Sequence, residues 1–206
     1  MSEHRINSPS EFTFTLLLAH GAGAGMDTEF MNGIAEGVAS HGIRVIRFEF
    51  PYMVKRRLEG KNTPPNRLPI LQSSFLEQMS TIEGPLVIAG KSMGGRVATT
   101  ILECSNATAG IALGYPFHPP GKPENLRIEH FTSLHKPLLV LQGTRDPFGN
   151  AIENPAQWLP DSATLTWVPD GEHSFKPRKA SGRTWEDNIQ FAIEHIVSFI
   201  SSLQSQ

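Results

Sequence analysis

Several features that define particular classes of protein are scarce or missing in this sequence. The 206 residues include one cysteine, Cys104, so no disulfide can form within the chain and a disulfide-stabilised fold is excluded. Because its neighbours are partly apolar, we expect Cys104 to be a small core residue. No apolar run approaches the ~20 residues that a membrane-spanning helix needs, and residues 1–5 lack the apolar stretch of a signal peptide. We therefore expect a soluble protein of the cytoplasm that has no membrane partner.

Charge and metal-ligand patterns are weak as well. The formal net charge is −2, which provides no general attraction to nucleic acid. The eight histidines are scattered without a His-x-x-x-His pair, and one cysteine cannot form a thiolate cluster. We therefore expect no metal, no cofactor and no nucleic-acid partner. The length and the 39% hydrophobic content suit one globular domain spanning residues 1–206.

What the sequence does contain is an alternation of short apolar runs with longer amphipathic segments. The runs of strand length are 14–19, 43–50, 86–89, 110–113, 138–141 and 165–168. Nearly continuous runs of this kind are typical of strands that are buried on both faces of a parallel sheet. Apolar residues at helical spacing lie between most of them, and a long amphipathic helix is expected at 191–200. The pattern predicts an α/β fold with about six mostly parallel strands, flanked by helices on both faces.

Two stretches that follow strands are expected to be irregular, residues 52–69 and 115–123. The first is a short basic insertion whose charges are Lys55, Arg56, Arg57, Lys61 and Arg67 against the single acid Glu59. Open α/β sheets bind ligands at the carboxyl ends of their strands, so both stretches should lie near a functional site. Two interpretations of the basic insertion remain open: it steers an acidic substrate, or it is a solvated loop whose arginines pair locally.

The strongest functional signal is the pattern Gly-Lys-Ser-Met-Gly at residues 90–94. It follows a predicted strand and opens a predicted helix, which is the context in which Gly-x-Ser-x-Gly presents a nucleophile. A serine on a tight strand-to-helix turn is lifted above the sheet, and bulky residues at the flanking glycines would crowd it. The N-terminus of the helix favours negative charge nearby. We predict that Ser92 is a catalytic nucleophile.

A serine hydroxyl is a poor nucleophile and needs a positioned base. His173 follows the predicted strand at 165–168, and Asp146 follows the one at 138–141, so later strands should bring both to the edge that carries Ser92. The order Ser, Asp, His is the one expected for this kind of turn. We predict that His173 is the general base and acid and that Asp146 orients its ring.

Other histidines and acids compete for these roles. His118 follows a different strand and His135 precedes one, so neither is delivered as well as the predicted base. Asp170 and Glu172 are close in sequence to that base, but residues so close rarely face one another across a turn. We therefore prefer Asp146 as the acid.

Acyl transfer also needs donors for the oxyanion of its tetrahedral intermediate. We assign one to the backbone N–H of Met93 and the other to the N–H of Ala22, with Gly23 as the neighbouring option. Ala22 lies in the glycine-rich loop at 20–25, where the backbone is able to approach a substrate closely. The same glycines are compatible with a dinucleotide-binding unit, but their spacing is Gly-x-Gly-x-Gly rather than Gly-x-Gly-x-x-Gly.

The chain resembles the α/β-hydrolase superfamily over nearly its whole length, and its dienelactone-hydrolase-like branch in particular. That branch includes small predicted hydrolases similar to the hydrolase-like domain of a nonspecific-lethal chromatin complex subunit. The stretches that carry the likeness are residues 19–24 (Ala-His-Gly-Ala-Gly-Ala), 90–95 (Gly-Lys-Ser-Met-Gly-Gly), 114–122 (Gly-Tyr-Pro-Phe-His-Pro-Pro-Gly-Lys) and 142–149 (Gln-Gly-Thr-Arg-Asp-Pro-Phe-Gly). The resemblance implies the triad assigned above and a hydrolase activity without a cofactor. Dienelactone hydrolases have a cysteine where this chain has Ser92, so dienelactone itself is not implied. The fold's usual two opening strands are not expected, since the first strong strand begins near Phe14, and the fold is predicted to be trimmed.

These observations predict a serine hydrolase that cleaves a small carboxylic ester or thioester through an acyl-serine intermediate. An amide or peptide bond is a less favoured substrate for the same residues. The alternative is an interaction module that retains the α/β-hydrolase fold without catalysis, because fold alone does not fix function. No large cap domain is visible in the sequence, so the site should be fairly open.

Overall fold

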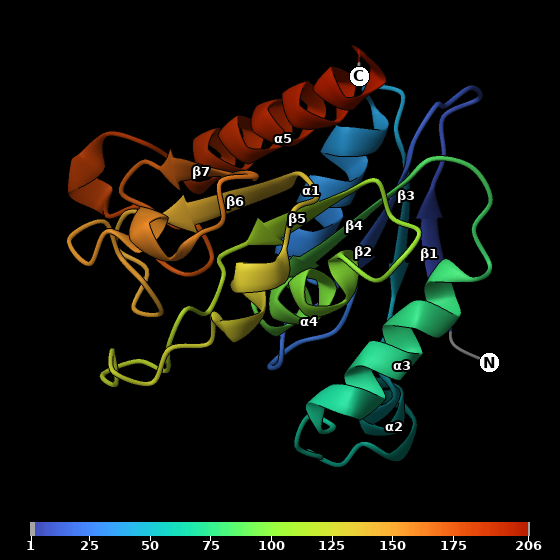
Figure 1. Ribbon diagram of the computed structural model, residues 1–206, viewed down its shortest axis with the longest axis horizontal. Coiled ribbons are helices and arrows are strands. Elements are labelled where there is room, and N and C mark those ends of the chain that lie inside the picture. Colours follow the sequence, from blue (N-terminus) through green and yellow to red (C-terminus); the bar gives the residue numbers. More distant parts are fainter. Residues whose placement is uncertain (1–2, 206) are drawn as a thin grey trace.

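Seven strands form one sheet in the computed structural model, which describes residues 3–205 (Figure 1). The strands are β1 (His4–Asn7), β2 (Thr15–Ala19), β3 (Arg44–Phe48), β4 (Leu86–Lys91), β5 (Ala109–Leu113), β6 (Leu138–Gly143) and β7 (Ala163–Val168). The α-helices are α1 (Glu29–Ala39), α2 (Pro51–Glu59), α3 (Leu68–Met79), α4 (Met93–Leu102) and α5 (Trp185–Ser202). The strand order is β1-β3-β2-β4-β5-β6-β7, and the predicted α/β fold with a mostly parallel sheet is confirmed.

The six predicted strands are the parallel part of this sheet, β2 to β7. The seventh, β1, was not predicted, and it pairs antiparallel with β3 at the sheet edge. Its four residues, His-Arg-Ile-Asn, contain one apolar side chain, and most of the strand is only half-buried. An edge strand of this length has too little hydrophobic patterning to be found from the sequence. The fold therefore keeps one short strand ahead of β2.

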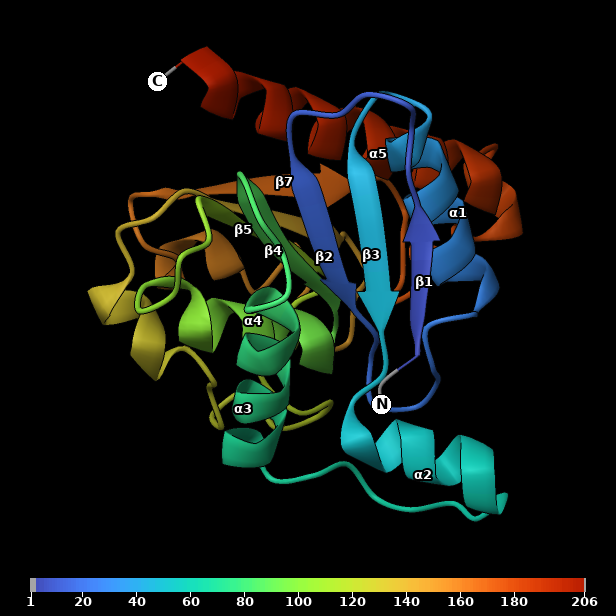
Figure 2. The same ribbon diagram turned by 90° about the vertical axis from the view of Figure 1, so that its right-hand side faces the viewer.

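Two hydrophobic clusters lie on opposite faces of the sheet. Alternate residues of β2 contribute to them in turn, with Leu17 in one cluster and Leu16 and Leu18 in the other, as the two-residue period of a strand requires. Helices α1 and α5 cover the Leu16 face, while α3 and α4 cover the Leu17 face (Figures 1 and 2). Because both faces are covered, the carboxyl ends of the strands are the part of the sheet left for ligands.

The basic insertion is more regular than the sequence suggested. Its first half is helix α2, which lies beyond the carboxyl end of β3 (Figure 2), so the expectation of an irregular segment was wrong there. Pro51 occupies the first helical turn, and Gly60 ends the helix in the left-handed conformation at φ 66°, which is where each residue type is favoured. Residues 61–67 carry no helix or strand before α3 begins, and neither do residues 115–123, as expected.

The expectation for Cys104 was also wrong, because its side chain is exposed. Helix α4 ends at Leu102, and the chain turns there, so the apolar neighbours Ile101 and Leu102 enter the core while Cys104 does not. Within residues 3–205, no helix combines the length and the apolar character needed to cross a bilayer.

Candidate active site

Ser92 occupies the junction between β4 and α4 in a backbone conformation that is costly for any residue except glycine. Its φ is 52° and its ψ is −115°, outside the regions that L-residues favour. The flanking glycines make room for this turn. A Cβ added to Gly90 would lie 2.1 Å from the carbonyl carbon of Gly94, and one added to Gly94 would lie 2.6 Å from the carbonyl oxygen of His20. The turn therefore requires both glycines, for the reason that the sequence pattern suggested.

The structure brings the three predicted side chains into one hydrogen-bonded row. The Nε2 atom of His173 lies 2.8 Å from the Oγ of Ser92, and the Nδ1 atom lies 2.8 Å from the Oδ2 of Asp146. Asp146 is fully buried, and its other oxygen accepts the N–H of Phe148 at 2.9 Å. An ionised carboxylate only accepts hydrogen bonds, so Nδ1 carries the ring proton and Nε2 is left to accept the Ser92 hydroxyl.

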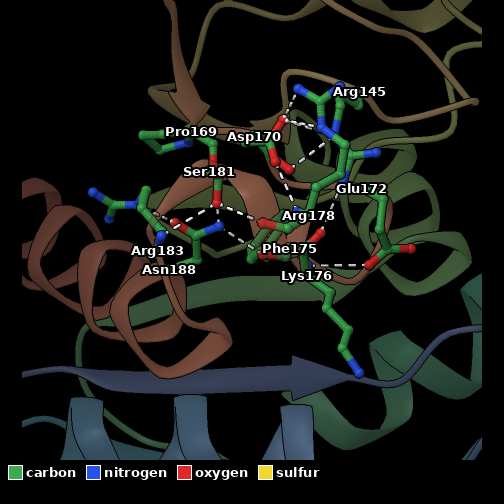
Figure 3. A network of polar contacts seen from close by, with 10 residues as sticks. All are labelled: Arg145, Pro169, Asp170, Glu172, Phe175, Lys176, Arg178, Ser181, Arg183 and Asn188. Atoms are coloured by element: carbon green, nitrogen blue, oxygen red, sulfur yellow. Dashed lines mark hydrogen bonds and ion pairs between the residues drawn. The ribbon is translucent and has the colours of Figure 1, made fainter.

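The two competing acids lie in a different network (Figure 3). Asp170 forms ion pairs with Arg145 and Arg178, and the hydrogen bond from Arg178 holds the pKa of Asp170 below its usual value. Glu172 accepts the backbone N–H groups of Ser174 and Lys176 through one carboxylate oxygen. Both acids therefore hold the loop that carries the His173 ring, and neither contacts that ring.

The two competing histidines also lie elsewhere. His118 is buried, with Nε2 2.7 Å from a carboxylate oxygen of Glu153 and Nδ1 2.9 Å from the carbonyl oxygen of Pro119. His135 is exposed, and its backbone N–H donates to Glu103. Within residues 3–205 neither ring has a contact with Ser92, and no group of three potential metal-ligating side chains gathers anywhere in that range.

A cleft of about 420 Å³ opens above Ser92 and is lined largely by small and apolar groups. Residues 21–25 form one wall, and Phe30, Met31 and Phe148 line others. The ring of Phe148 lies over that of His173, with centroids 4.3 Å apart. The His173 side chain keeps 19% of its surface exposed, so solvent reaches the row of hydrogen bonds from the cleft.

The two residues predicted to supply oxyanion donors lie close to Ser92. Met93 is the first residue of α4, directly after Ser92, and Ala22 lies in the wall at 21–25. A Cβ added to the adjacent Gly21 would lie 3.6 Å from the Cβ of Ser92, so this wall reaches Ser92. Within residues 3–205, neither N–H has a hydrogen-bond partner in the protein.

Lys91 is a cleft residue whose role the sequence did not indicate. Its side chain is only 9% exposed, and Nζ donates to the carbonyl oxygen of His173 at 2.6 Å. Nζ also lies 5.5 Å from the centroid of the Phe30 ring. Burial lowers the pKa of Lys91 to about 8, against the opposing effect of Asp146 and Glu172. A lysine at a strand end normally reaches solvent, so only the three-dimensional contacts show that Lys91 ties the end of β4 to the loop that carries His173.

Two of the three arginines of the basic insertion, Arg56 and Arg57, make contacts within the protein. Arg57 forms ion pairs with Glu49 and Glu3. Arg56 donates to the carbonyl oxygen of Thr63 and lies over the ring of Tyr52. These contacts favour the local-pairing interpretation of the insertion over substrate steering.

Comparison with known proteins identifies the family. The family model described as "Alpha/beta hydrolase domain" matches residues 12–201. Among solved structures, Est1E from Butyrivibrio proteoclasticus is 13% identical over 98% of this chain and 94% of that one, with a TM-score of 0.73. A dienelactone hydrolase from Anabaena variabilis is 19% identical over 94% of this chain and 89% of that one, with a TM-score of 0.67. An α/β serine hydrolase without a lid from Xanthomonas campestris is 20% identical over 94% of this chain and 87% of that one, with a TM-score of 0.65. The expected resemblance to the superfamily and its dienelactone-hydrolase-like branch is confirmed, and the chain belongs to the α/β hydrolase domain family.

Proposed function

We propose that this protein is a serine hydrolase that cleaves a small carboxylic ester or thioester through an acyl-serine intermediate. The observation that carries the proposal is the row of two 2.8 Å hydrogen bonds from Ser92 through His173 to Asp146 at the floor of an apolar cleft. A nucleophile in contact with a base that a third group orients is the arrangement that activates a serine hydroxyl. The catalytic unit is the whole chain acting as a single domain.

The reaction proceeds in two symmetrical halves. His173 Nε2 takes the proton of the Ser92 hydroxyl while Oγ attacks the acyl carbon, and the carbonyl electron pair moves onto the oxygen. The N–H groups of Met93 and Ala22 bind that oxyanion. When the intermediate collapses, the bond to the leaving alcohol or thiol breaks, and His173 returns the proton to the leaving group. Water, activated by the same ring, then attacks the acyl-serine and releases the acid. Asp146 holds the ring and stabilises its protonated form in both halves.

The size and lining of the cleft favour a substrate with a small, mainly apolar acyl group. Its volume is about 420 Å³, near the lower end of the range for small-molecule pockets. Several similar structures are named as esterases or serine hydrolases, including an esterase domain from Rhodothermus marinus and the Xanthomonas campestris protein. These names agree with ester cleavage as the proposed reaction.

The proposal is tested by treating the purified protein with a fluorophosphonate probe and recording the intact mass. The wild type should gain one adduct, and Ser92→Ala and His173→Ala should gain none while keeping the wild-type circular dichroism spectrum. Ser174→Ala removes the other serine hydroxyl that borders the cleft and should keep the adduct. Short- and medium-chain esters and thioesters then define the acyl preference. A folded wild type that forms no adduct would overturn the proposal and favour the interaction module.

A further inference from the structure

The loop that carries the proposed oxyanion donor is held from behind by a tyrosine of the basic insertion. The hydroxyl of Tyr52 donates to the carbonyl oxygens of Gly21 at 3.1 Å and of Ala22 at 3.0 Å. Tyr52 is 3% exposed and belongs to the hydrophobic core, and it is not among the residues that line the cleft. Both carbonyl groups therefore point away from the cleft and towards the core.

This contact determines where the neighbouring N–H groups point. In a trans peptide unit the C=O of one residue and the N–H of the next point in opposite directions. With the C=O of Gly21 fixed on the tyrosine, the N–H of Ala22 points to the opposite side, where the cleft lies. The same relation joins the C=O of Ala22 to the N–H of Gly23. One hydroxyl thus orients two consecutive peptide planes of the cleft wall.

We infer that Tyr52 is a positioning residue for the oxyanion site, holding the carbonyl oxygens of Gly21 and Ala22 so that the N–H of Ala22 stays aimed at the oxygen of the substrate. The inference rests on the proposed function, since it assigns a residue that acts through one of the proposed donors. It also gives the basic insertion a role, which is to support the cleft wall.

His20 holds the same loop from a second direction. The N–H of Phe50 donates to Nε2 of His20 at 3.1 Å, so the ring proton is on Nδ1, which donates to the carbonyl oxygen of Gly21 at 2.7 Å. Burial lowers the pKa of His20, which keeps the ring neutral and this pattern intact. The carbonyl oxygen of Gly21 thus receives two donors, whereas that of Ala22 depends on Tyr52. Loss of the tyrosine hydroxyl should therefore leave the Gly21 carbonyl oxygen with one of its two donors, so the aim of the Ala22 N–H should be weakened but not abolished.

The insertion fixes Tyr52 in turn. The N–H of Tyr52 donates to the side-chain oxygen of Asn66 at 2.9 Å, and the hydroxyl of Thr63 donates to the carbonyl oxygen of Tyr52 at 3.1 Å. The guanidinium of Arg56 lies 5.1 Å from the centroid of the tyrosine ring. Burial raises the pKa of Tyr52 to about 12, so its hydroxyl remains a donor throughout the pH range of an ester assay.

The test is Tyr52→Phe, which removes the hydroxyl and keeps the buried ring, with Tyr115→Phe as the matched control. Tyr115 is the other tyrosine of the chain, is fully buried, and its hydroxyl also donates to a backbone carbonyl, that of Arg127 at 2.6 Å. We expect Tyr52→Phe to lower kcat for an ester on the order of 10- to 100-fold, less than the loss of an entire donor, with KM changed less than about 3-fold. Tyr115→Phe should leave kcat within about 3-fold of the wild type, whatever it does to the melting temperature.

A trifluoromethyl ketone provides a readout that general destabilisation would not move. It forms a tetrahedral adduct with the nucleophile that carries an oxyanion, so its inhibition constant should rise with Tyr52→Phe by about the factor by which kcat falls. Equal kcat and equal inhibition in wild type and Tyr52→Phe would overturn the inference while leaving the proposed function intact. A wild type that reacts with neither ester nor fluorophosphonate would instead overturn the proposed function.

If Tyr52→Phe does not fold, Asn66→Ala removes the acceptor of the Tyr52 N–H and should lower kcat at least about 3-fold. An unchanged kcat in that variant would overturn the inference as well.

Discussion

The buried ammonium of Lys91 makes a quantitative prediction about stability and pH. Burial lowers its pKa from 10.5 to about 8 in the folded protein, while the unfolded chain keeps the higher value. Between these two pH values the unfolded state binds more protons, so the free energy of unfolding must rise with pH across this window. Below pH 8 the group is protonated in both states, and above 10.5 in neither. The direction is the reverse of that for a lysine whose folded-state pKa is raised by an ion pair.

The size of the effect follows from the same shift. The whole window corresponds to about 3 kcal/mol, and about 2 kcal/mol of it falls between pH 7.5 and 9.5. We expect urea unfolding of the wild type to gain that amount over this range relative to Lys91→Met, which has no titrating group at the position. The assay should stop at pH 9.5, because tyrosines of the unfolded chain begin to ionise near pH 10. Circular dichroism at pH 7.5, 8.5 and 9.5 gives the three unfolding curves.

The lowered pKa of Lys91 is tested by how the free energy of unfolding changes with pH in wild type and in Lys91→Met, and not by the absolute stability of either protein. Lys91→Met changes packing and removes the hydrogen bond to His173, so a constant offset between the two proteins is expected. Lys122→Met is the control, because Lys122 is exposed, and its stability should change with pH in parallel with the wild type. If the curves of wild type and Lys91→Met also run parallel, the ammonium is not desolvated as described, and the account of Lys91 is wrong.

Two further substitutions test the turn and the acid. Gly94→Ala places a Cβ 2.6 Å from one backbone oxygen and 2.7 Å from another. It should lower the free energy of unfolding in urea by about 1–3 kcal/mol and slow fluorophosphonate labelling; a fully stable, fast-reacting variant would contradict the packing argument. Asp146→Asn should lower the rate of ester hydrolysis on the order of 10³- to 10⁴-fold without unfolding the protein, because a neutral amide neither fixes the His173 tautomer nor stabilises its charged form. Asp170→Asn is its control, and a comparable rate loss there would contradict the assignment of the acid.

The parallel strands and the candidate site were predictable from the sequence for a shared reason. Strands buried on both faces must be almost entirely apolar, so β2 and β4 to β6 are visible as short continuous runs. Polar residues directly after such runs then lie at the ligand-binding edge. Ser92, Asp146 and His173 stand out for that reason, and the structure brings their side chains within hydrogen-bond distance.

The supporting residues were not predictable, because their roles depend on contacts between distant segments. Tyr52 is a single aromatic residue in a stretch dominated by basic charges, and nothing in that stretch indicates that its hydroxyl reaches the loop 30 residues earlier. Lys91 resembles an ordinary exposed lysine until His173 is placed beside it. Strand β1 is defined by its partner β3 rather than by a hydrophobic pattern of its own. In each case the decisive contact joins residues far apart in the sequence, which a local sequence pattern does not describe.

The spread of the site along the chain has a consequence for how the protein folds. Ser92 and His173 are 81 residues apart, and Tyr52 is 31 residues from Gly21, so these contacts close long loops. Contacts at large sequence separation carry a high loop-closure cost and slow the folding reaction. The hydrogen-bonded row and the cleft wall can thus assemble only after β2, β4, β6 and β7 have joined the same sheet. During refolding, recovery of fluorophosphonate reactivity should lag behind recovery of the helical circular dichroism signal. The rate of covalent labelling then reports when the native topology is complete.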